Sequence, residues 1–107
     1  MDLKKNYING EWVAGSGVRD NINPSDITEI VGHYAQADAA QTRDAIAAAK
    51  AAQPAWAATT PQQRADTLEK VGLELVARKE ELGKLLSREE GKPLAFSIGG
   101  IARWPDF

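Results

Sequence analysis

The sequence predicts an α+β segment with an N-terminal β-hairpin or meander over its first third, followed by three helices. Three observations predict this order. An Asn-Gly pair stands between two apolar pairs near the N-terminus, an Ala-rich stretch without helix breakers follows Asp38, and apolar residues recur at i, i+3, i+4 spacing beyond Pro61. The 107 residues amount to one domain at most.

The strands are expected before residue 36. Residues 7–13 read Tyr-Ile-Asn-Gly-Glu-Trp-Val, and Asn9-Gly10 tolerates the positive φ angles of a type I′ hairpin turn. Residues 18–23 favour a strand, and their polar side chains place it at a sheet edge. Asn-Pro-Ser-Asp at 23–26 is typical of a turn, because proline drives the preceding residue into an extended conformation. Residues 29–35 then complete the meander.

The first helix is predicted from its cap and its alanines. Asp38 is a favourable N-cap, and Gln41 stands where a capping box has Glu or Gln. Residues 39–53 contain no helix breaker and have high helix propensity. Pro54 is expected to end or kink this helix, and Trp56 is expected in the connection as an apolar anchor.

The second helix has the clearest start in the chain. Thr-Pro-Gln-Gln at 60–63 offers a capping box with proline at the first helical position. Apolar residues then recur through residues 65–76, and a third series follows at 82–86. Gly91 is expected just past the end of that third helix, with Pro93 as a stop.

Composition excludes several classes of function for this chain by itself. It contains no cysteine, which excludes disulfides, thiolate metal sites and thiol catalysis, and its single histidine, His33, makes no metal cluster. The formal net charge is -2 without a basic run, so neither nucleic acid nor an anionic membrane is an expected partner. No apolar stretch approaches the roughly 20 residues of a membrane span, and no signal peptide is visible, so a cytoplasmic location is expected.

No group of residues in the sequence supports catalysis, cofactor binding or metal binding, so we predict no site residues. Glu89, Glu90 and Lys92 are a charged cluster beside a glycine; they are read as solvated charges at a helix end rather than a base or an anion contact. Gly99-Gly100 lacks the pattern of a dinucleotide-binding turn. His33 stands alone and is read as a surface or packing residue.

The remaining polar and aromatic candidates also have structural interpretations. Turns and caps account for three acidic residues that lack the spacing of a calcium loop: Asp26, Asp38 and Asp44. The aromatic residues offer either a binding face or anchors of a small core, and the second is favoured because aromatic rings bury the largest area: Tyr7, Trp12, Tyr34 and Trp56.

Taken together, the motifs resemble the N-terminal segment of an NAD(P)-dependent aldehyde dehydrogenase. They are Tyr-Ile-Asn-Gly-Glu-Trp at 7–12, Ile-Asn-Pro-Ser at 22–25, Pro-Ala-Trp at 54–56 and Glu-Gly-Lys-Pro-Leu at 90–94. The resemblance covers about residues 6–94. In the residues of these motifs the chain is most similar to the bacterial enzymes that act on α-ketoglutarate semialdehyde and related short acid semialdehydes.

The resemblance implies the start of an α/β cofactor-binding domain from a homo-oligomeric parent enzyme. Such enzymes oxidise an aldehyde to a carboxylate with NAD or NADP, using a Cys nucleophile and a Glu that assists water. The counterparts of those residues fall beyond Phe107, so neither catalytic nor cofactor-binding residues are expected in this chain. Some members hold a structural monovalent cation through the backbone position matched by Ile22, but the other ligands are missing and no metal site is predicted.

The resemblance to the family stops near Ala95. We therefore divide the chain into residues 1–94, the N-terminal part of the cofactor-binding domain, and a non-family tail at 95–107. Trp-Pro-Asp-Phe at 104–107 can be encoded so that a one-base shift reads Gly-Gln-Ile-Phe, which is family-like. We therefore expect a truncated and frameshifted dehydrogenase segment, with a designed or unrelated short C-terminus as the alternative.

The sequence leaves two interpretations of the isolated chain. It is predicted to be inactive as a dehydrogenase fragment; the alternative is a small helical protein-interaction module without a catalytic role. Both predict amphipathic helices with exposed apolar faces, through which the isolated chain is expected to self-associate.

Overall fold

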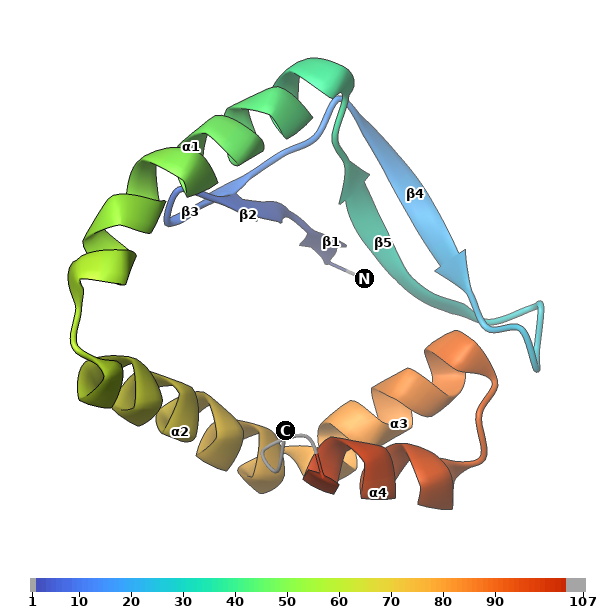
Figure 1. Ribbon diagram of the computed structural model, residues 1–107. Coiled ribbons are helices and arrows are strands. Elements are labelled where there is room, and N and C mark those ends of the chain that lie inside the picture. Colours follow the sequence, from blue (N-terminus) through green and yellow to red (C-terminus); the bar gives the residue numbers. More distant parts are fainter. Residues whose placement is uncertain (1, 104–107) are drawn as a thin grey trace. The chain divides into compact units, whose positions relative to one another are not determined.

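The computed structural model describes residues 2–103, in which five short strands precede four helices (Figure 1). The α+β class predicted from the sequence is confirmed. The elements are β1 (Leu3–Lys4), β2 (Asn6–Ile8), β3 (Glu11–Val13), β4 (Gly17–Ile22), β5 (Ile30–Gln36), α1 (Ala39–Ala58), α2 (Pro61–Ala77), α3 (Lys79–Glu90) and α4 (Leu94–Arg103). Contacts group the described residues into two compact units: residues up to 21 with 32–59, and residues 22–31 with those from 60 onward.

The Asn-Gly hairpin forms as the sequence predicts. β2 and β3 pair antiparallel with Ile8 opposite Glu11, which leaves a two-residue loop. Asn9 and Gly10 adopt φ angles of 52° and 81°, both in the left-handed region that a type I′ turn requires. The rings of Tyr7 and Trp12 lie opposite each other with centroids 4.8 Å apart, a cross-strand aromatic contact.

The other strands form a separate sheet, so the prediction that all the strands make one continuous meander is wrong. The strand order is β1-β5-β4, and β1 runs parallel to β5 with Leu3 opposite His33. A two-residue strand shows no alternation, and a parallel partner some thirty residues away has no local sequence signal. β4 lies at the end of this order, where its polar composition placed it.

The start of α1 is fixed by two residues with different roles. Asp38 caps the helix by accepting a 2.8 Å hydrogen bond from the Gln41 backbone N–H, as predicted. The Gln41 side chain does not close the capping box. It donates to the Ala14 carbonyl at 2.7 Å and accepts from Asn6 Nδ2 at 2.8 Å, so it ties the helix start to the N-terminal strands.

Of the two alternatives predicted for Pro54, an end of the helix is wrong, because α1 runs through Pro54 to Ala58. Proline removes one backbone hydrogen bond, but only one turn follows it, and the residues of that turn are mostly alanine. Trp56 therefore lies inside the last turn rather than in the connection. Its carbonyl accepts both the Thr59 N–H at 3.2 Å and the Thr59 hydroxyl at 2.6 Å, which closes the helix.

In the second unit, the helix start and the helix end that the sequence predicts are both present, together with one helix that it does not predict. Thr60 and Gln63 make the complete capping box of α2, and Gly91 ends α3 with φ 71°. α4 follows Pro93 directly, so the structure has four helices where three were expected. Gly99-Gly100 lowers the helix propensity of this segment, but its apolar residues pack on α2 and α3 and outweigh that loss. α4 includes residues 95–103 of the expected tail; residues 104–107 lie outside the described residues.

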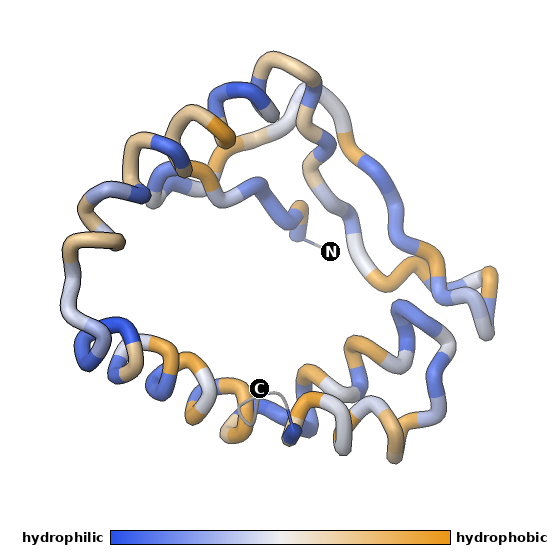
Figure 2. Tube along the Cα trace, viewed as in Figure 1, coloured by the Kyte–Doolittle hydropathy of each residue, from blue (hydrophilic) through white to orange (hydrophobic). Residues whose placement is uncertain are grey.

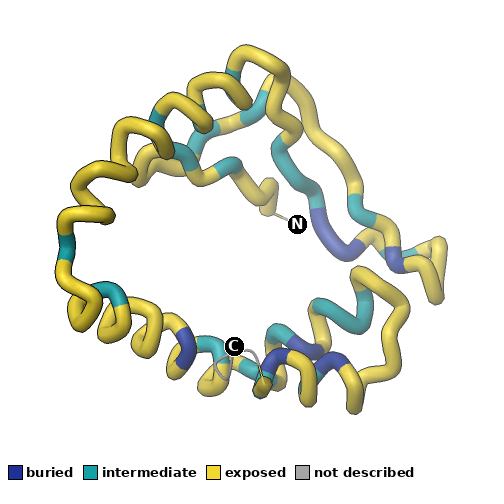
Figure 3. Tube along the Cα trace, viewed as in Figure 1, coloured by how far each residue is buried: buried dark blue, intermediate teal, exposed yellow. Residues whose placement is uncertain are grey.

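The core of the second unit is thin and rests on small residues (Figure 3). Gly72 of α2, Gly83 of α3 and Ser97 of α4 are buried, and Ser97 is fully enclosed with no hydrogen-bond partner for its hydroxyl. Val31 and Ile101 are the buried apolar side chains among the described residues. Small residues let the helices approach closely, but they bury little apolar area, so most large apolar side chains remain exposed.

Candidate functional site

A cluster of polar side chains joins the turn before β5 to the end of α3. We call it the Asn23–Glu29–Arg88 cluster. Asn23 Nδ2 donates to Glu29 Oε2 at 2.7 Å, and Arg88 Nε donates to Glu29 Oε1 at 2.7 Å. Arg88 Nη2 lies 2.6 Å from the same Oε1 in an ion pair. Glu29 and Arg88 are 59 positions apart, so these bonds fix a long-range contact within the second unit.

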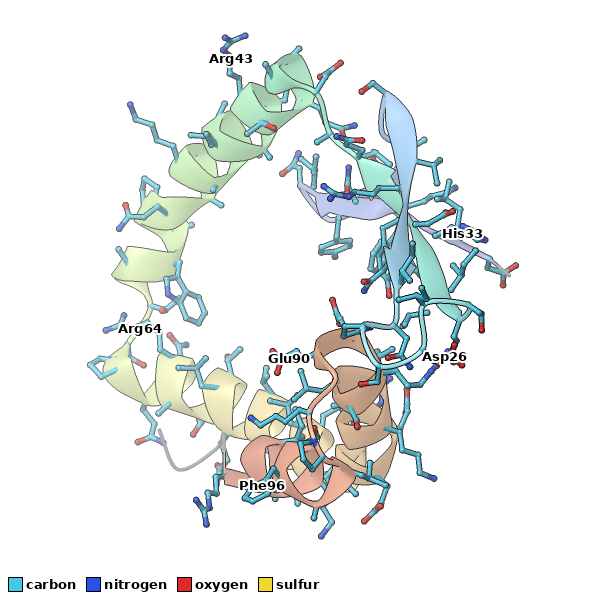
Figure 4. The ribbon with its side chains drawn as sticks, turned by 90° about the vertical axis from the view of Figure 1, so that its right-hand side faces the viewer. Asp26, His33, Arg43, Arg64, Glu90 and Phe96 are labelled. Carbon is cyan, nitrogen blue, oxygen red and sulfur yellow. The ribbon has the colours of Figure 1, made fainter. Side chains whose placement is uncertain are left out.

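The turn that carries Glu29 is organised by its own polar side chains, as the Asn-Pro-Ser-Asp sequence predicts. Asn23 is 8% exposed, and its Oδ1 accepts the Ser25 N–H at 2.8 Å. Asp26 (Figure 4) accepts from the Thr28 hydroxyl at 2.6 Å and from its N–H at 3.1 Å. These two bonds, the hydroxyl first, hold the pKa of Asp26 below its ordinary value.

The same turn lies against the end of α3 at Gly91. A Cβ on Gly91 would stand 2.9 Å from Ser25 Oγ and 3.1 Å from Pro24 Cγ, and its φ of 71° also favours glycine. The Ser87 hydroxyl donates to the Lys92 carbonyl at 2.5 Å and so closes the chain after Gly91. Two motifs far apart in the sequence, Asn-Pro-Ser and Glu-Gly-Lys-Pro, therefore belong to one local structure.

The electrostatics of the cluster favour a structural role. The hydrogen bond from Asn23, and then that from Arg88, lower the pKa of Glu29 below its ordinary value of 4.5. A carboxylate held ionised by two donated hydrogen bonds and an ion pair is a weak base, because proton uptake would weaken those interactions. The cluster therefore stabilises the turn against α3 rather than moving protons.

We expect this stabilisation to disappear in acid. The pKa of Glu29 is lower in the folded chain than in the unfolded chain, so its contribution is present above the unfolded value and is lost as the pH falls through the folded value. Glu29→Gln should lower the urea midpoint at pH 7, and the gap to wild type should shrink below a pH of about 4. Glu69→Gln makes the same change of charge at an exposed position of α2 and is the control. A gap that stays constant from pH 7 to about pH 3 would contradict the role given to the Glu29 carboxylate.

His33 has a partner that the sequence did not reveal. Its Nδ1 lies 2.5 Å from Asp20 Oδ1, between the neighbouring strands β5 and β4, and both side chains are partly exposed. The pairing could be found only once the strand order was known. Two residues of this kind make an ion pair or a hydrogen bond, and a catalytic role would need a nucleophile beside them as well.

The other sequence candidates are dispersed over the described residues. Glu90 (Figure 4) is exposed in the last turn of α3. Glu89 in the same turn and Lys92 just after it are also exposed. Gly99-Gly100 lies inside α4 and not in a turn between a strand and a helix. Asp44 is exposed on α1.

The expectation that the aromatic residues anchor a core is wrong for the hairpin. Tyr7 and Trp12 are 62% and 67% exposed, and Trp56 is 45% exposed. A two-stranded ribbon leaves much of its rings at the surface, where those of Tyr7 and Trp12 contact each other.

Two surface hollows occur in the first unit. One lies between the hairpin turn and the alanine face of α1, and is lined by Tyr7, Ile8, Asn9, Gly10 and Ala45, Ala48, Ala49 and Ala52. The other is lined by Leu3, Lys4, Lys5, Trp12 and Tyr34. Neither lining pairs a nucleophile with a base. Over residues 2–103, no three His, Asp or Glu side chains are placed to hold a metal ion, and no helix is long and apolar enough to cross a membrane.

Comparison with known proteins identifies the family. The model of the aldehyde dehydrogenase family matches residues 12–107. The glutarate-semialdehyde dehydrogenase of Pseudomonas aeruginosa is 39% identical over 97 residues, which are 90% of this chain and 20% of that enzyme. The α-ketoglutarate semialdehyde dehydrogenase of Haloferax volcanii is 36% identical over 104 residues, 95% of this chain and 22% of that enzyme.

A solved structure agrees with these relatives. The NAD-dependent aldehyde dehydrogenase of Sinorhizobium meliloti matches 98% of this chain and 22% of its own, with a TM-score of 0.92 and 31% identity. Fold and sequence thus agree on one class of oxidoreductase segment. The chain belongs to the aldehyde dehydrogenase family, and it spans about a fifth of the length of the curated relatives it matches.

Proposed function

We propose that this chain serves as part of an enzyme that oxidises a short acid semialdehyde to the carboxylate with NAD or NADP. The observation that carries the proposal is the family match over residues 12–107. The substrate class is supported by the names of two relatives, which act on the semialdehydes of glutarate and α-ketoglutarate.

The chemistry of such an enzyme requires groups that the described residues do not contribute. In such an enzyme NAD(P)⁺ would supply the hydride acceptor, and a Cys thiolate and a water molecule would serve as nucleophiles, so that aldehyde, NAD(P)⁺ and water would give carboxylate, NAD(P)H and two protons. This chain contains no cysteine. Its own contribution in the proposal is structural: the Asn23–Glu29–Arg88 cluster and the capped helices hold the segment in shape.

A segment exchange tests whether this chain performs that role. The matching 97 residues of the Pseudomonas aeruginosa enzyme are replaced by their counterparts from this chain, and NAD(P)H formation is followed with glutarate semialdehyde. We expect the chimaera to keep activity within about tenfold of its parent, because the family fold tolerates substitution when patterning and volume are kept. The isolated chain should produce no NAD(P)H.

The alternative of a helical interaction module gives the opposite pattern. It would show an inactive chimaera together with an isolated chain that unfolds cooperatively and binds one partner saturably. A chimaera that is soluble and folded but inactive would count against the proposed function.

The coding DNA tests the substrate class and the expected tail. Sequencing past the codon for Phe107 shows whether another reading frame continues aldehyde dehydrogenase text with a Cys codon. The protein from such a frame can then be assayed with acid semialdehydes and with unsubstituted aldehydes of equal length. Preference for the acid semialdehydes is the expected result, and a preference for unsubstituted aldehydes would refute the substrate class.

A further inference from the structure

The turn of the β2–β3 hairpin contains an asparagine followed directly by a glycine. Asn9 and Gly10 form the two-residue loop between Ile8 and Glu11, and both are exposed. The segment where β2 turns into β3 is hydrophilic in Figure 2 and exposed in Figure 3. The backbone nitrogen of the residue after an asparagine can attack the side-chain amide carbon, and glycine hinders this attack least because it has no Cβ. The reacting groups and the water that the reaction consumes are therefore both available at this loop.

The other three asparagines of the chain are poorer sites for the same reaction. In two of them the next residue has a bulky side chain that crowds the attacking nitrogen: Asn6-Tyr7 and Asn21-Ile22. The third, Asn23, precedes Pro24, which has no backbone N–H for the attack. Asn23 is also buried, and its Nδ2 donates to Glu29 at 2.7 Å. These three asparagines serve as internal controls for Asn9.

The closed hairpin holds the reacting atoms apart. The φ angles of 52° at Asn9 and 81° at Gly10 are those of a type I′ turn, in which ψ of the first loop residue is about +30°. Such a ψ puts the Gly10 nitrogen on the side of the Cα–C bond away from Asn9 Cβ, whereas a ring that contains Cβ, Cγ and this nitrogen needs them on the same side. The turn must therefore open before the ring can close.

Few contacts hold the hairpin closed. A two-stranded hairpin is marginally stable by itself. Here the rings of Tyr7 and Trp12 contact each other across the strands, and Asn6 Nδ2 donates to Gln41 Oε1 at 2.8 Å. The side chains of α1 that line the hollow beside the turn are all alanines, which leaves room for the loop to move. The opening of the hairpin is therefore expected to control how fast Asn9 reacts.

We propose that Asn9 is a site of spontaneous deamidation that opening of the β2–β3 hairpin controls. The Gly10 nitrogen bonds to Asn9 Cγ and gives up its proton, the Cγ–Nδ2 bond breaks, and ammonia leaves a succinimide ring. Water then opens the ring, either at Cγ to give aspartate or at the backbone carbonyl carbon to give isoaspartate. The net change is the uptake of water and the release of ammonia, without oxidation or reduction. This inference does not depend on the proposed function.

The two products have different effects on the hairpin. Aspartate followed by glycine favours the same type I′ turn, so the hairpin can close again. Isoaspartate carries the chain through Cβ and Cγ and adds an atom to the backbone of the loop. Because loop length fixes the register of a hairpin, the pairing of Ile8 with Glu11 and of Tyr7 with Trp12 is then lost. Formation of isoaspartate thus leaves the hairpin open.

The test follows the loss of each asparagine amide in the full chain by peptide mass spectrometry. The chain is incubated at mildly alkaline pH in buffer and in urea above its unfolding midpoint. Fragmentation of the peptide that contains Asn9 distinguishes isoaspartate from aspartate. We expect Asn9 to react before the other three asparagines, and to react about threefold or more faster in urea, where the turn is open. The isoaspartate form, once separated, should lose the near-ultraviolet circular dichroism of the Tyr7–Trp12 pair, and Asn9→Asp should keep it.

Two tryptophan variants test the control by the hairpin. Trp12→Ala removes the cross-strand ring contact and should raise the rate at Asn9 in buffer by about two- to fivefold. Trp56→Ala is the matched control, because Trp56 is an exposed ring in the last turn of α1 and forms no part of the hairpin. It should leave the rate unchanged. In urea all three chains should react at Asn9 at the same rate.

Three results would overturn the inference. An Asn9 amide that survives in urea, or that is lost after the amide of Asn21, would show that this turn is not the reactive site. Equal rates at Asn9 in buffer and in urea would show that the hairpin does not control the reaction. Equal acceleration by Trp12→Ala and Trp56→Ala would mean that general loosening of the chain, rather than opening of this hairpin, sets the rate.

Discussion

Gly15→Ala should destabilise the isolated chain more than the same change at Gly32 or Gly83. A Cβ at this position would stand 2.2 Å from the carbonyl oxygen of Gln36, 2.6 Å from its carbonyl carbon and 2.8 Å from its nitrogen. All three are backbone atoms of β5, so no side-chain rotation relieves the clash. The 3.0 Å hydrogen bond from the Ser16 N–H to the Gln36 carbonyl would be lost with it. We expect a cost of about 3 kcal/mol or more.

Gly17→Ala is the matched control for that experiment. A Cβ there would find its nearest neighbour, the flexible Gln36 side chain, at 4.0 Å, so the change should be nearly neutral. Urea unfolding followed by circular dichroism compares the two variants with wild type at equal slope. Equal midpoints for Gly15→Ala and Gly17→Ala would show that the backbone of residue 15 does not approach β5 this closely.

Gly83→Ala is expected to give the second-largest effect, by separating α3 from α4. The added Cβ would lie 2.5 Å from Ile98 Cγ1, 2.9 Å from its Cα and 3.0 Å from its nitrogen. The Ile98 side chain can turn, but its backbone cannot, so the two helices must move apart. We expect a loss of about 1–3 kcal/mol, even though alanine favours a helix by roughly 1 kcal/mol over glycine.

Gly99→Ala provides a control of opposite sign. The position is exposed in α4, and an added Cβ would meet nothing within 4 Å. Alanine should therefore stabilise the helix by up to about 1 kcal/mol. Urea midpoints that rise for both Gly99→Ala and Gly83→Ala would mean that α3 and α4 do not pack through Gly83.

Local signals predicted much of the fold, because the residues that carry them act on their own neighbours. The Asn9-Gly10 turn, the Asp38 cap and the capping box at 60–63 each depend on backbone geometry within four residues. β1 and α4 were missed for the opposite reason. β1 forms through pairing with a distant strand, and α4 depends on packing that outweighs the low propensity of its two glycines.

The polar cluster could not be predicted in the same way. Each motif that contributes to it, Asn-Pro-Ser and Glu-Gly-Lys-Pro, was visible in the sequence as a turn or a helix end. Their contact depends on the path of the chain between them, and Glu29 and Arg88 carry no local sign that they pair. The resemblance to the family rests on the order and spacing of these motifs, and it does not show that they contact each other.

The separation between Glu29 and Arg88 also sets an order of events during synthesis on the ribosome. The turn at 23–29 emerges 59 residues before the arginine that fixes it. At about 5–20 residues per second, the nascent turn waits roughly 3–12 s without that partner. Asn23 donates to Glu29 from six positions away, so it is available at once to hold the turn during that interval. The turn is thus stabilised first by the local hydrogen bond from Asn23 and later by the long-range hydrogen bond from Arg88.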